Sequence, residues 1–333
     1  MGKPRNSASG RQSPEYRRAR PDKQSHPIEH VGFNQQRLHA VQVGLGTFGT
    51  VLQNLAGASH EWDAWIGWLL EATSEWRQER FRAVAVEPVL EHVSRLRRRF
   101  STELPGVAIV HAALGEHSVE QEIYVVADHA YETALLAVVS EDQREDLDRS
   151  LTYLRNMSCV GSPHPDFEFW RKKIWYKFGA DVVPEVRSTH VWTYRKLVQD
   201  LDFKGVDLLV VDAEGYDTMI LRSVVGYCRA QETEGSLEWP DVICFETQGH
   251  CDTKDGSGSE AACLQMLEEC GYSVLLSSLT TTLVKNSALK RHRRLRTWVE
   301  KHMSCRVCAS TSWPFCMEGG DNLLCSGCSM NIP

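Results

Sequence analysis

Short apolar runs alternate with amphipathic stretches along most of the chain, and this alternation predicts strands separated by helices. We expect five β-strands, at 38–43, 83–86, 107–110, 206–211 and 242–245. The run at 206–211 is apolar nearly throughout, as expected of a parallel strand that is buried on both faces. Together these elements predict an α/β fold with a doubly wound, mostly parallel sheet.

The pattern changes near the end of this series. A helix is expected at 257–270, because serines stand at its start and Gly271 just past its end. Two strands, 272–276 and 281–284, follow with only a short serine and threonine connection between them, which predicts a terminal antiparallel hairpin. In such a sheet, ligands bind at the carboxyl ends of the parallel strands.

Several segments depart from this pattern and divide the chain. Residues 1–36 are rich in Arg, Lys, Ser, Pro and Gln without apolar periodicity, so we expect a disordered basic tail. The α/β domain is expected at 37–286. Within it, residues 127–187 show no regular alternation of strand and helix, which indicates an insertion that either shapes a substrate site or packs without a ligand. Residues 287–333 are expected to form a basic linker and a cysteine-rich module.

Composition and charge narrow the class of protein. With 333 residues and 42% hydrophobic content, the chain is long enough to bury a core. A net charge of −7 excludes a global attraction to nucleic acid or anionic membranes. The basic stretch 290–301 is a local exception: it contacts nucleic acid or an acidic protein, or is a solvated linking helix. Because no apolar stretch is long enough to cross a bilayer and the N-terminus lacks a signal-peptide core, we expect a cytoplasmic protein without a membrane partner.

Cysteines are concentrated at the C-terminal end, where five of the eleven fall in the last 29 residues. Cys305-x2-Cys308 and Cys325-x2-Cys328 have the spacing of a four-thiolate zinc ribbon. A segment this small would need the metal in order to fold. We therefore expect structural zinc in a small ribbon-like module, with Cys316 either replacing one ligand or remaining a free thiol.

A glycine turn follows the first expected strand. Gly44-x-Gly46-x-x-Gly49 lets the backbone come close to a ligand, and Glu87 ends the second strand, where a carboxylate can accept hydrogen bonds from the ribose of an adenosyl cofactor. A nicotinamide dinucleotide site places its acidic residue about 20 residues after the glycines, and Glu87 follows at almost twice that distance. The alternative is a simple tight turn and a surface charge.

Five motifs carry a family resemblance. In chain order they are Val41-Gln42-Val43-Gly44-x-Gly46-x-x-Gly49, Val86-Glu87-Pro88, Ala113-Leu114-Gly115, Asp212-x-Glu214-Gly215 and Pro240-Asp241-Val242-Ile243-x-Phe245-Glu246. They span most of the chain and resemble the FkbM-type S-adenosylmethionine-dependent methyltransferases. The most specific piece is 206–215, which is similar to the "DLLKIDVEG" strand and turn of that family.

The resemblance implies a class I methyltransferase fold, S-adenosylmethionine as the methyl donor, and transfer to oxygen. It also implies the set of residues that contact the cofactor, namely Gly44, Gly46, Gly49, Glu87, Pro88, Ala113 and Asp212. This sequence departs from the family at Gln42, where an acidic residue is common. The departure removes one anchor near the methionine end of the cofactor.

Candidate catalytic groups follow the two strands beside the point where the strand order reverses. They are Asp212, Glu214, Glu246 and His250. Asp212 is the strongest candidate, because a carboxylate that ends a buried strand is expensive to desolvate unless it binds something. Its alternative role is capping the next helix, and with Glu214 it could instead hold a divalent cation. His250 is either a general base or a solvated side chain.

The sequence supports three hypotheses about function. The leading one is a methyltransferase that acts on a hydroxyl of a small molecule or glycan. A second is a NAD-dependent oxidoreductase, against which the late position of Glu87 and the terminal hairpin argue. A third is a catalytically inactive fold that binds nucleic acid or protein, as Gln42 and the basic stretch 290–301 suggest.

Overall fold

The computed structural model describes residues 38–44, 81–103, 107–137, 140–163, 165–202, 205–234, 239–277 and 280–291. Gly46 and Gly49 lie outside the described residues, as do the predicted tail at 1–36 and the four predicted zinc ligands. The predictions made for those residues therefore stay predictions.

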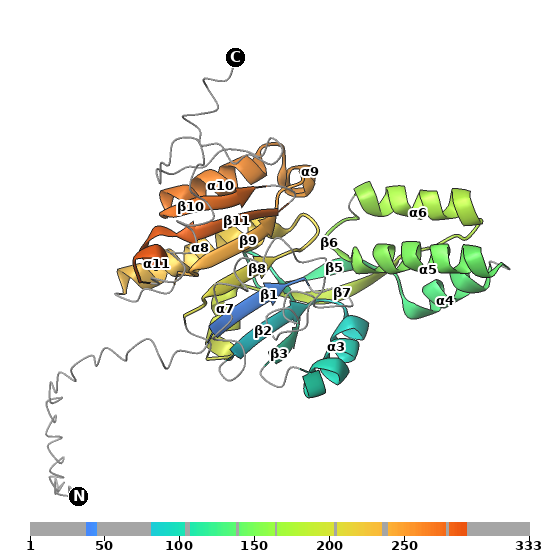
Figure 1. The fold of residues 1–333 in the computed structure, drawn as a ribbon, viewed down its shortest axis with the longest axis horizontal. Helices are drawn as coiled ribbons and strands as arrows, with labels where there is room; N and C mark the ends of the chain where they lie inside the picture. The colour runs from blue at the N-terminus through green and yellow to red at the C-terminus, as the bar shows by residue number, and fades with distance from the viewer. Residues whose placement is uncertain are drawn as a thin grey trace, which may run out of the picture. The chain divides into compact units, whose positions relative to one another are not determined.

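A seven-stranded sheet forms the centre of the fold (Figure 1). Its order is β10 (Tyr272–Ser277), β11 (Thr280–Lys285), β9 (Val242–Glu246), β8 (Leu208–Val211), β1 (Leu38–Val43), β2 (Phe81–Glu87) and β3 (Val107–His111). The last five of these strands are parallel to one another, whereas β11 is antiparallel to both β9 and β10. The predicted α/β fold, with its mostly parallel sheet and terminal antiparallel hairpin, is confirmed.

Helices cover this sheet. Helices α7 (Tyr194–Asp200), α8 (Asp217–Thr233) and α10 (Ser259–Glu269) share one apolar core with alternate residues of β1, β2, β8 and β9. Helix α3 (Leu90–Glu103) packs against β2 and β3 outside that core, and the short helices α9 (His250–Asp255) and α11 (Asn286–Arg291) follow β9 and β11. Across the described ranges, no helix combines the length and the apolar character that crossing a membrane requires.

A second sheet lies next to the first and was not predicted. Its order is β4 (Ala113–Leu114), β7 (Glu185–Trp192), β5 (Val119–Val125) and β6 (Cys159–Val160). Strand β5 is antiparallel to β6 and β7, while β4 is parallel to β7. The sequence did not indicate the partners of these strands.

Residues between β5 and β7 are mostly helical. They form α4 (Asp128–Leu136), α5 (Glu141–Asn156) and α6 (Pro165–Phe178), which lie beside the second sheet in Figure 1. These helices share an apolar core of their own, with buried residues such as Leu147, Leu151, Phe167 and Ile174. The stretch 127–187, in which the sequence showed no regular alternation of strand and helix, therefore consists mainly of three helices and a short strand, inserted between β5 and β7.

Candidate functional site

The carboxyl ends of four neighbouring strands form one row of functional groups. Glu87 is the last residue of β2 and Glu246 is the last residue of β9. Between them, Gly44 and Asp212 directly follow β1 and β8. Because carboxyl ends of parallel strands meet at one edge, Gly44 and Asp212 lie at the place where the strand order reverses, with the carboxylates of Glu87 and Glu246 on the strands to either side.

Position 44 accepts only a glycine, because a side chain there would collide with neighbouring backbone. Its φ is +76°, and a Cβ built on it would lie only 1.6 Å from the carbonyl oxygen of Asp212. The Gly44 N–H donates to Val86 O at 3.0 Å, and the Asp212 N–H donates to Val43 O at 2.9 Å. The first glycine of the turn therefore lets the backbone after β1 touch the backbone after β8.

Glu87 is buried rather than solvated. Its side chain is 1% exposed, so the alternative that it is a surface charge is wrong. Oε1 accepts the Val89 N–H at 2.9 Å and lies 3.3 Å from His92 Nδ1. The carboxylate is thus fixed by the start of α3. The following Pro88 is partly buried, and its carbonyl lies 3.1 Å from Nε2 of His111.

The other predicted cofactor contact, Ala113, lies in β4 and is buried in a small apolar cluster with Val89 and Val191. It therefore lies close to the residues that follow Glu87, at the junction of the two sheets. Any contact from Ala113 to a ligand would have to come from its backbone, because its methyl group is packed against protein.

A tight turn carries Glu214. Glu214 and Gly215 adopt φ values of +51° and +89°, so the chain makes two successive left-handed residues between β8 and α8. A Cβ on Gly215 would lie 2.7 Å from the carbonyl oxygen of His250, which explains the glycine. A left-handed glutamate costs on the order of 1–3 kcal/mol, and such strain is concentrated at functional sites. The turn brings Glu214 against the start of α9.

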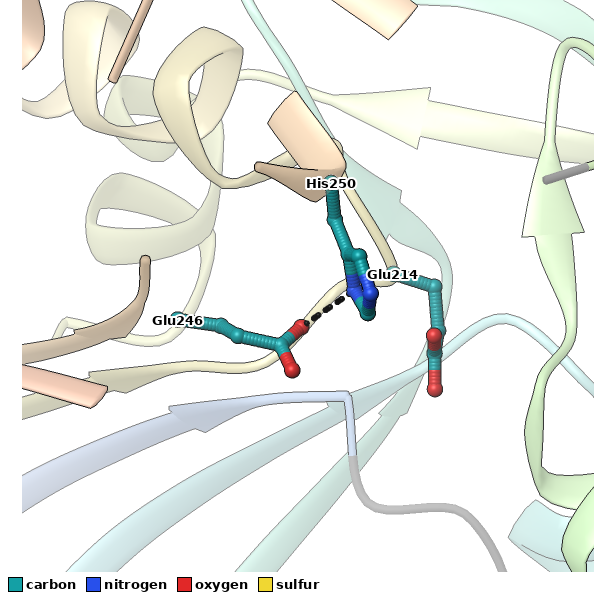
Figure 2. A group of neighbouring side chains, drawn as sticks. All are labelled: Glu214, Glu246 and His250. Atoms are coloured by element: carbon teal, nitrogen blue, oxygen red, sulfur yellow. Dashed lines mark hydrogen bonds and ion pairs between the residues drawn. The ribbon is translucent and has the colours of Figure 1, made fainter. Parts of the chain in front are cut away.

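Glu214, Glu246 and His250 lie together, as Figure 2 shows. One potential ligand atom from each lies within 4.8 Å of the others. His250 Nδ1 is 3.0 Å from Glu246 Oε2, while Gln248 Nε2 donates to Glu246 Oε1 at 2.6 Å. The Glu246 and His250 side chains are only 15% and 16% exposed. Three of the four predicted catalytic candidates therefore form one cluster.

Asp166 joins this cluster from a distant part of the sequence. It lies in the first turn of α6, and its Oδ2 is 3.2 Å from His250 Nε2. Burial and the negative charges of Glu214 and Asp166 raise the pKa of the phenol of Tyr153, which lies in α5. The Tyr153 ring packs on Trp170 with centroids 4.9 Å apart. The helices of residues 127–187 thus reach the strand ends, which no local sequence signal indicated.

Acidic side chains dominate the electrostatics at the carboxyl ends of β8 and β9. The Asp212 side chain is exposed to solvent, in contrast to the burial expected from its strand. Desolvation and the charges of Glu246 and Asp217 raise its pKa to about 8. Desolvation and the charge of Asp212 raise the pKa of Glu214 as well. Hydrogen bonding to Glu246 raises the pKa of His250 to about 9.

Asp217, which sequence reasoning did not single out, lies beneath the turn. It is fully buried as the first residue of α8, and its Oδ2 accepts the Ala213 N–H at 3.4 Å. Its Oδ1 is buried with no hydrogen-bond partner among the described residues. Burial and the charge of Glu246 raise its pKa to about 7. An acidic residue in the first turn of a helix is common, so its position gave no signal of this role.

These raised pKa values predict that stability falls with increasing pH. Between pH 6 and pH 8 the folded protein holds protons on Asp212, Asp217 and His250 that the unfolded chain releases, because each folded pKa exceeds its unfolded value. The stabilisation is thus lost as pH rises through about 7 to 9. We expect a lower urea midpoint at pH 8 than at pH 6, and a shallower dependence in His250→Gln. An equal or higher midpoint at pH 8 would contradict this electrostatic description.

The residues near Gly44 fit the methionine end of S-adenosylmethionine. Gln42 is 4% exposed, and its Nε2 donates to the Gly44 carbonyl at 3.3 Å. Its Oε1 is buried and has no hydrogen-bond partner in the described part of the chain. Buried acceptors are seldom left unpaired, so this oxygen suits a donor group on a ligand, such as an ammonium.

Comparisons with known proteins give a likeness of fold only. No protein-family model matches the sequence, and no curated protein matches it. Among solved structures, the chain is similar to fibrillarin of Aeropyrum pernix, solved in complex with natively bound S-adenosyl-L-methionine, with a TM-score of 0.32 and 10% identity over 75% of this chain and 67% of that chain. At that identity and score the cofactor and substrate of this chain must be argued from its own site. The FkbM resemblance stays a prediction.

Proposed function

We propose that this protein is an S-adenosylmethionine-dependent methyltransferase that transfers the methyl group to a hydroxyl oxygen of a small molecule or glycan. The observation that supports it best is the row at the carboxyl edge: a glycine in tight contact with the next strand, flanked by Glu87 and Asp212. The Oε1 of Gln42, which is buried without a hydrogen-bond partner among the described residues, adds a third polar group for the same ligand.

Each group in the row has a distinct role in this proposal. Glu87 accepts hydrogen bonds from the ribose hydroxyls, Gln42 Oε1 accepts one from the ammonium, and the Gly44 backbone lines the approach. When bound, the cofactor supplies a methyl group on a cationic sulfur, which an oxygen nucleophile can attack in line. Positioning then provides much of the rate.

Proton removal from the acceptor hydroxyl falls to a carboxylate. The imidazole of His250 is protonated at neutral pH, because its pKa is raised to about 9 beside Glu246, so it does not act as the base in that state. The pKa of Asp212 is lower than that of His250, at about 8, so a larger fraction of Asp212 than of His250 is deprotonated near neutral pH and able to accept the proton. We therefore assign the base to Asp212, and to Glu214, Glu246 and His250 the binding and orientation of the acceptor.

Calorimetric titration of the full chain with S-adenosylmethionine, and separately with NAD, tests the proposal. We expect saturable binding of S-adenosylmethionine at about one site per chain and no binding of NAD. Binding of NAD alone would identify an oxidoreductase instead. Binding of neither would favour the inactive binding module.

Glu87→Gln is expected to weaken S-adenosylmethionine binding by roughly 10- to 100-fold, the range for losing hydrogen bonds to a charged acceptor. Glutamine keeps an oxygen that can accept the Val89 N–H, so the start of α3 should remain intact. The dissociation constant measured by calorimetry checks this. Glu120→Gln, at an exposed position of β5, is the control and should bind as the wild type does. Equal affinities for the two variants would remove Glu87 from the site.

We further propose structural zinc at Cys305, Cys308, Cys325 and Cys328, and a contact of residues 290–301 with nucleic acid or an acidic protein surface. Apart from Lys290 and Arg291 at the end of α11, these residues lie outside the described part of the chain. The support is the spacing of the four cysteines and the local positive charge.

A further inference from the structure

The cluster at the ends of β8 and β9 carries negative charge that basic residues do not balance. Within the described ranges, no lysine or arginine forms an ion pair with Asp212, Glu214 or Glu246, and the one cationic group hydrogen-bonded there is His250. The nearby Lys254 instead donates to the carbonyl oxygen of Val160 at 3.1 Å. Carboxylates gathered at low exposure are costly unless a cation joins them.

We propose that Glu214, Glu246 and His250 form a binding site for a divalent cation, to which the hydroxyl oxygen of the methyl acceptor coordinates. Two carboxylates and an imidazole suit a hard or borderline ion such as Mn²⁺. Binding of the ion does not depend on the proposed function, whereas the role of the ion toward the acceptor does.

The spacing of the three side chains fits coordination. For metal–ligand bonds of about 2.1 Å in an octahedron, adjacent ligand atoms are about 3.0 Å apart. Nδ1 of His250 and Oε2 of Glu246 are 3.0 Å apart, and a Glu214 oxygen lies within 4.8 Å of one potential ligand atom of each of these two residues. The ion would replace the proton that His250 and Glu246 share, and that proton would pass to solvent.

The surrounding groups support an ion at this position. The three ligands come from separate elements, the β8–α8 turn, the end of β9 and the start of α9 (Figure 2). Gln248 holds the second oxygen of Glu246, which fixes the orientation of that carboxylate as outer hydrogen bonds do in metal sites.

The ion would lower the pKa of a coordinated hydroxyl and hold its oxygen at the strand ends. In the transfer step, the hydroxyl proton passes to Asp212, the oxygen electron pair forms the new bond to the methyl carbon, and the carbon–sulfur bond breaks with its electron pair left on sulfur. Sulfur loses its positive charge in that step, so atoms and charge balance. The acceptor class is then a hydroxyl compound able to donate an oxygen to a cation.

Titration of the full chain with Mn²⁺, followed by the electron paramagnetic resonance signal of the free ion, tests the site. We expect about one site per chain, and binding at least 10-fold weaker in both Glu246→Gln and His250→Gln, as is typical when a ligand is lost. Glu268→Gln, exposed on α10, is the charge-matched control and should bind as the wild type does. Thiolates prefer softer metals, so the C-terminal cysteines should not contribute to this signal.

The outcomes separate the two proposals. No saturable Mn²⁺ binding, or equal affinity in the wild type and both variants, would overturn the cation site. S-adenosylmethionine titration of the same samples reports on the donor: donor binding without Mn²⁺ binding rejects only the inference, and Mn²⁺ binding without donor binding rejects only the proposed function. If circular dichroism shows that either variant does not fold, Glu214→Gln replaces it. In that case the melting temperature of the wild type is also measured with and without Mn²⁺. A melting temperature that Mn²⁺ does not raise would count against the site.

Discussion

Gly44→Ala is expected to destabilise the protein by more than about 3 kcal/mol and to abolish S-adenosylmethionine binding. The added methyl would lie 1.6 Å from the Asp212 carbonyl oxygen, so β1 and β8 would have to separate at their carboxyl ends. A left-handed φ of +76° adds strain for any residue with a Cβ. Urea unfolding gives the loss of stability, and calorimetry gives the loss of binding.

Gly226→Ala is the matched control for that experiment. Gly226 lies on the exposed side of α8, and nothing lies within 4 Å of a Cβ built there. Alanine favours a helix interior, so this variant should be more stable than the wild type by about 0.5–1 kcal/mol. If the free energy of unfolding falls in Gly44→Ala and rises in Gly226→Ala, the loss of stability is due to the close contact at Gly44. A Gly44→Ala protein as stable as the wild type would mean that the two strand ends do not meet as described.

Asp212→Asn is expected to lower methyl transfer at least 100-fold, the lower end of the range for losing a general base. Asparagine keeps the size of the side chain but cannot accept a proton from a hydroxyl. The measurement is transfer of labelled methyl from S-adenosylmethionine to acceptors in a fractionated cell extract. Because the carboxylate suffers repulsion from Glu246 and Asp217, we also expect the urea midpoint above pH 8 to stay equal or rise.

The control for Asp212 is Asp200→Asn, which removes a carboxylate from an exposed ion pair with Lys196 on α7. Such pairs contribute little, so transfer should be unchanged and stability should fall by no more than about 0.5 kcal/mol. A normal rate in Asp212→Asn would assign the base elsewhere. An equal loss of rate in both variants would point to a general charge effect.

The central sheet was predictable because strands that are buried on both faces require continuous runs of apolar residues. Strand β8 is buried at all four positions, which requires a continuous apolar run, and the sequence at 206–211 provides it. The hairpin of β10 and β11 was predictable from its short connection. The position of each strand within the sheet could not be predicted. For example, β11 pairs with β9 through residues such as Thr281 and Thr282, and nothing in their sequence indicates which strand they pair with.

The second sheet was missed for a physical reason. Strand β7 alternates exposed and buried side chains around charged residues such as Glu185 and Arg187, so it lacks the apolar run of the central strands. Strands β4 and β6 are two residues long each. Their pairing joins residues far apart in sequence, such as Ala113 with Val191 and Ile123 with Val160, and local patterns contain no information on such contacts.

The site was predictable only in part. The rule that parallel strands bring their carboxyl ends together placed the predicted residues Glu214, Glu246 and His250 near one another, and they do lie together. It could not show that Glu87 is buried against α3, nor that Asp166 approaches His250 from α6. Both depend on how helices pack, which the spacing of residues along the chain does not determine.

Helices α4, α5 and α6 have an apolar core of their own, distinct from that of the central sheet. Regions of one fold can open locally at different free energies. We therefore expect amide hydrogens in these helices to exchange at a different rate from those between β1, β8 and β9. Asp166 lies in α6, so a local opening of these helices would part Asp166 from His250 while Glu214 and Glu246 stay at the ends of the strands.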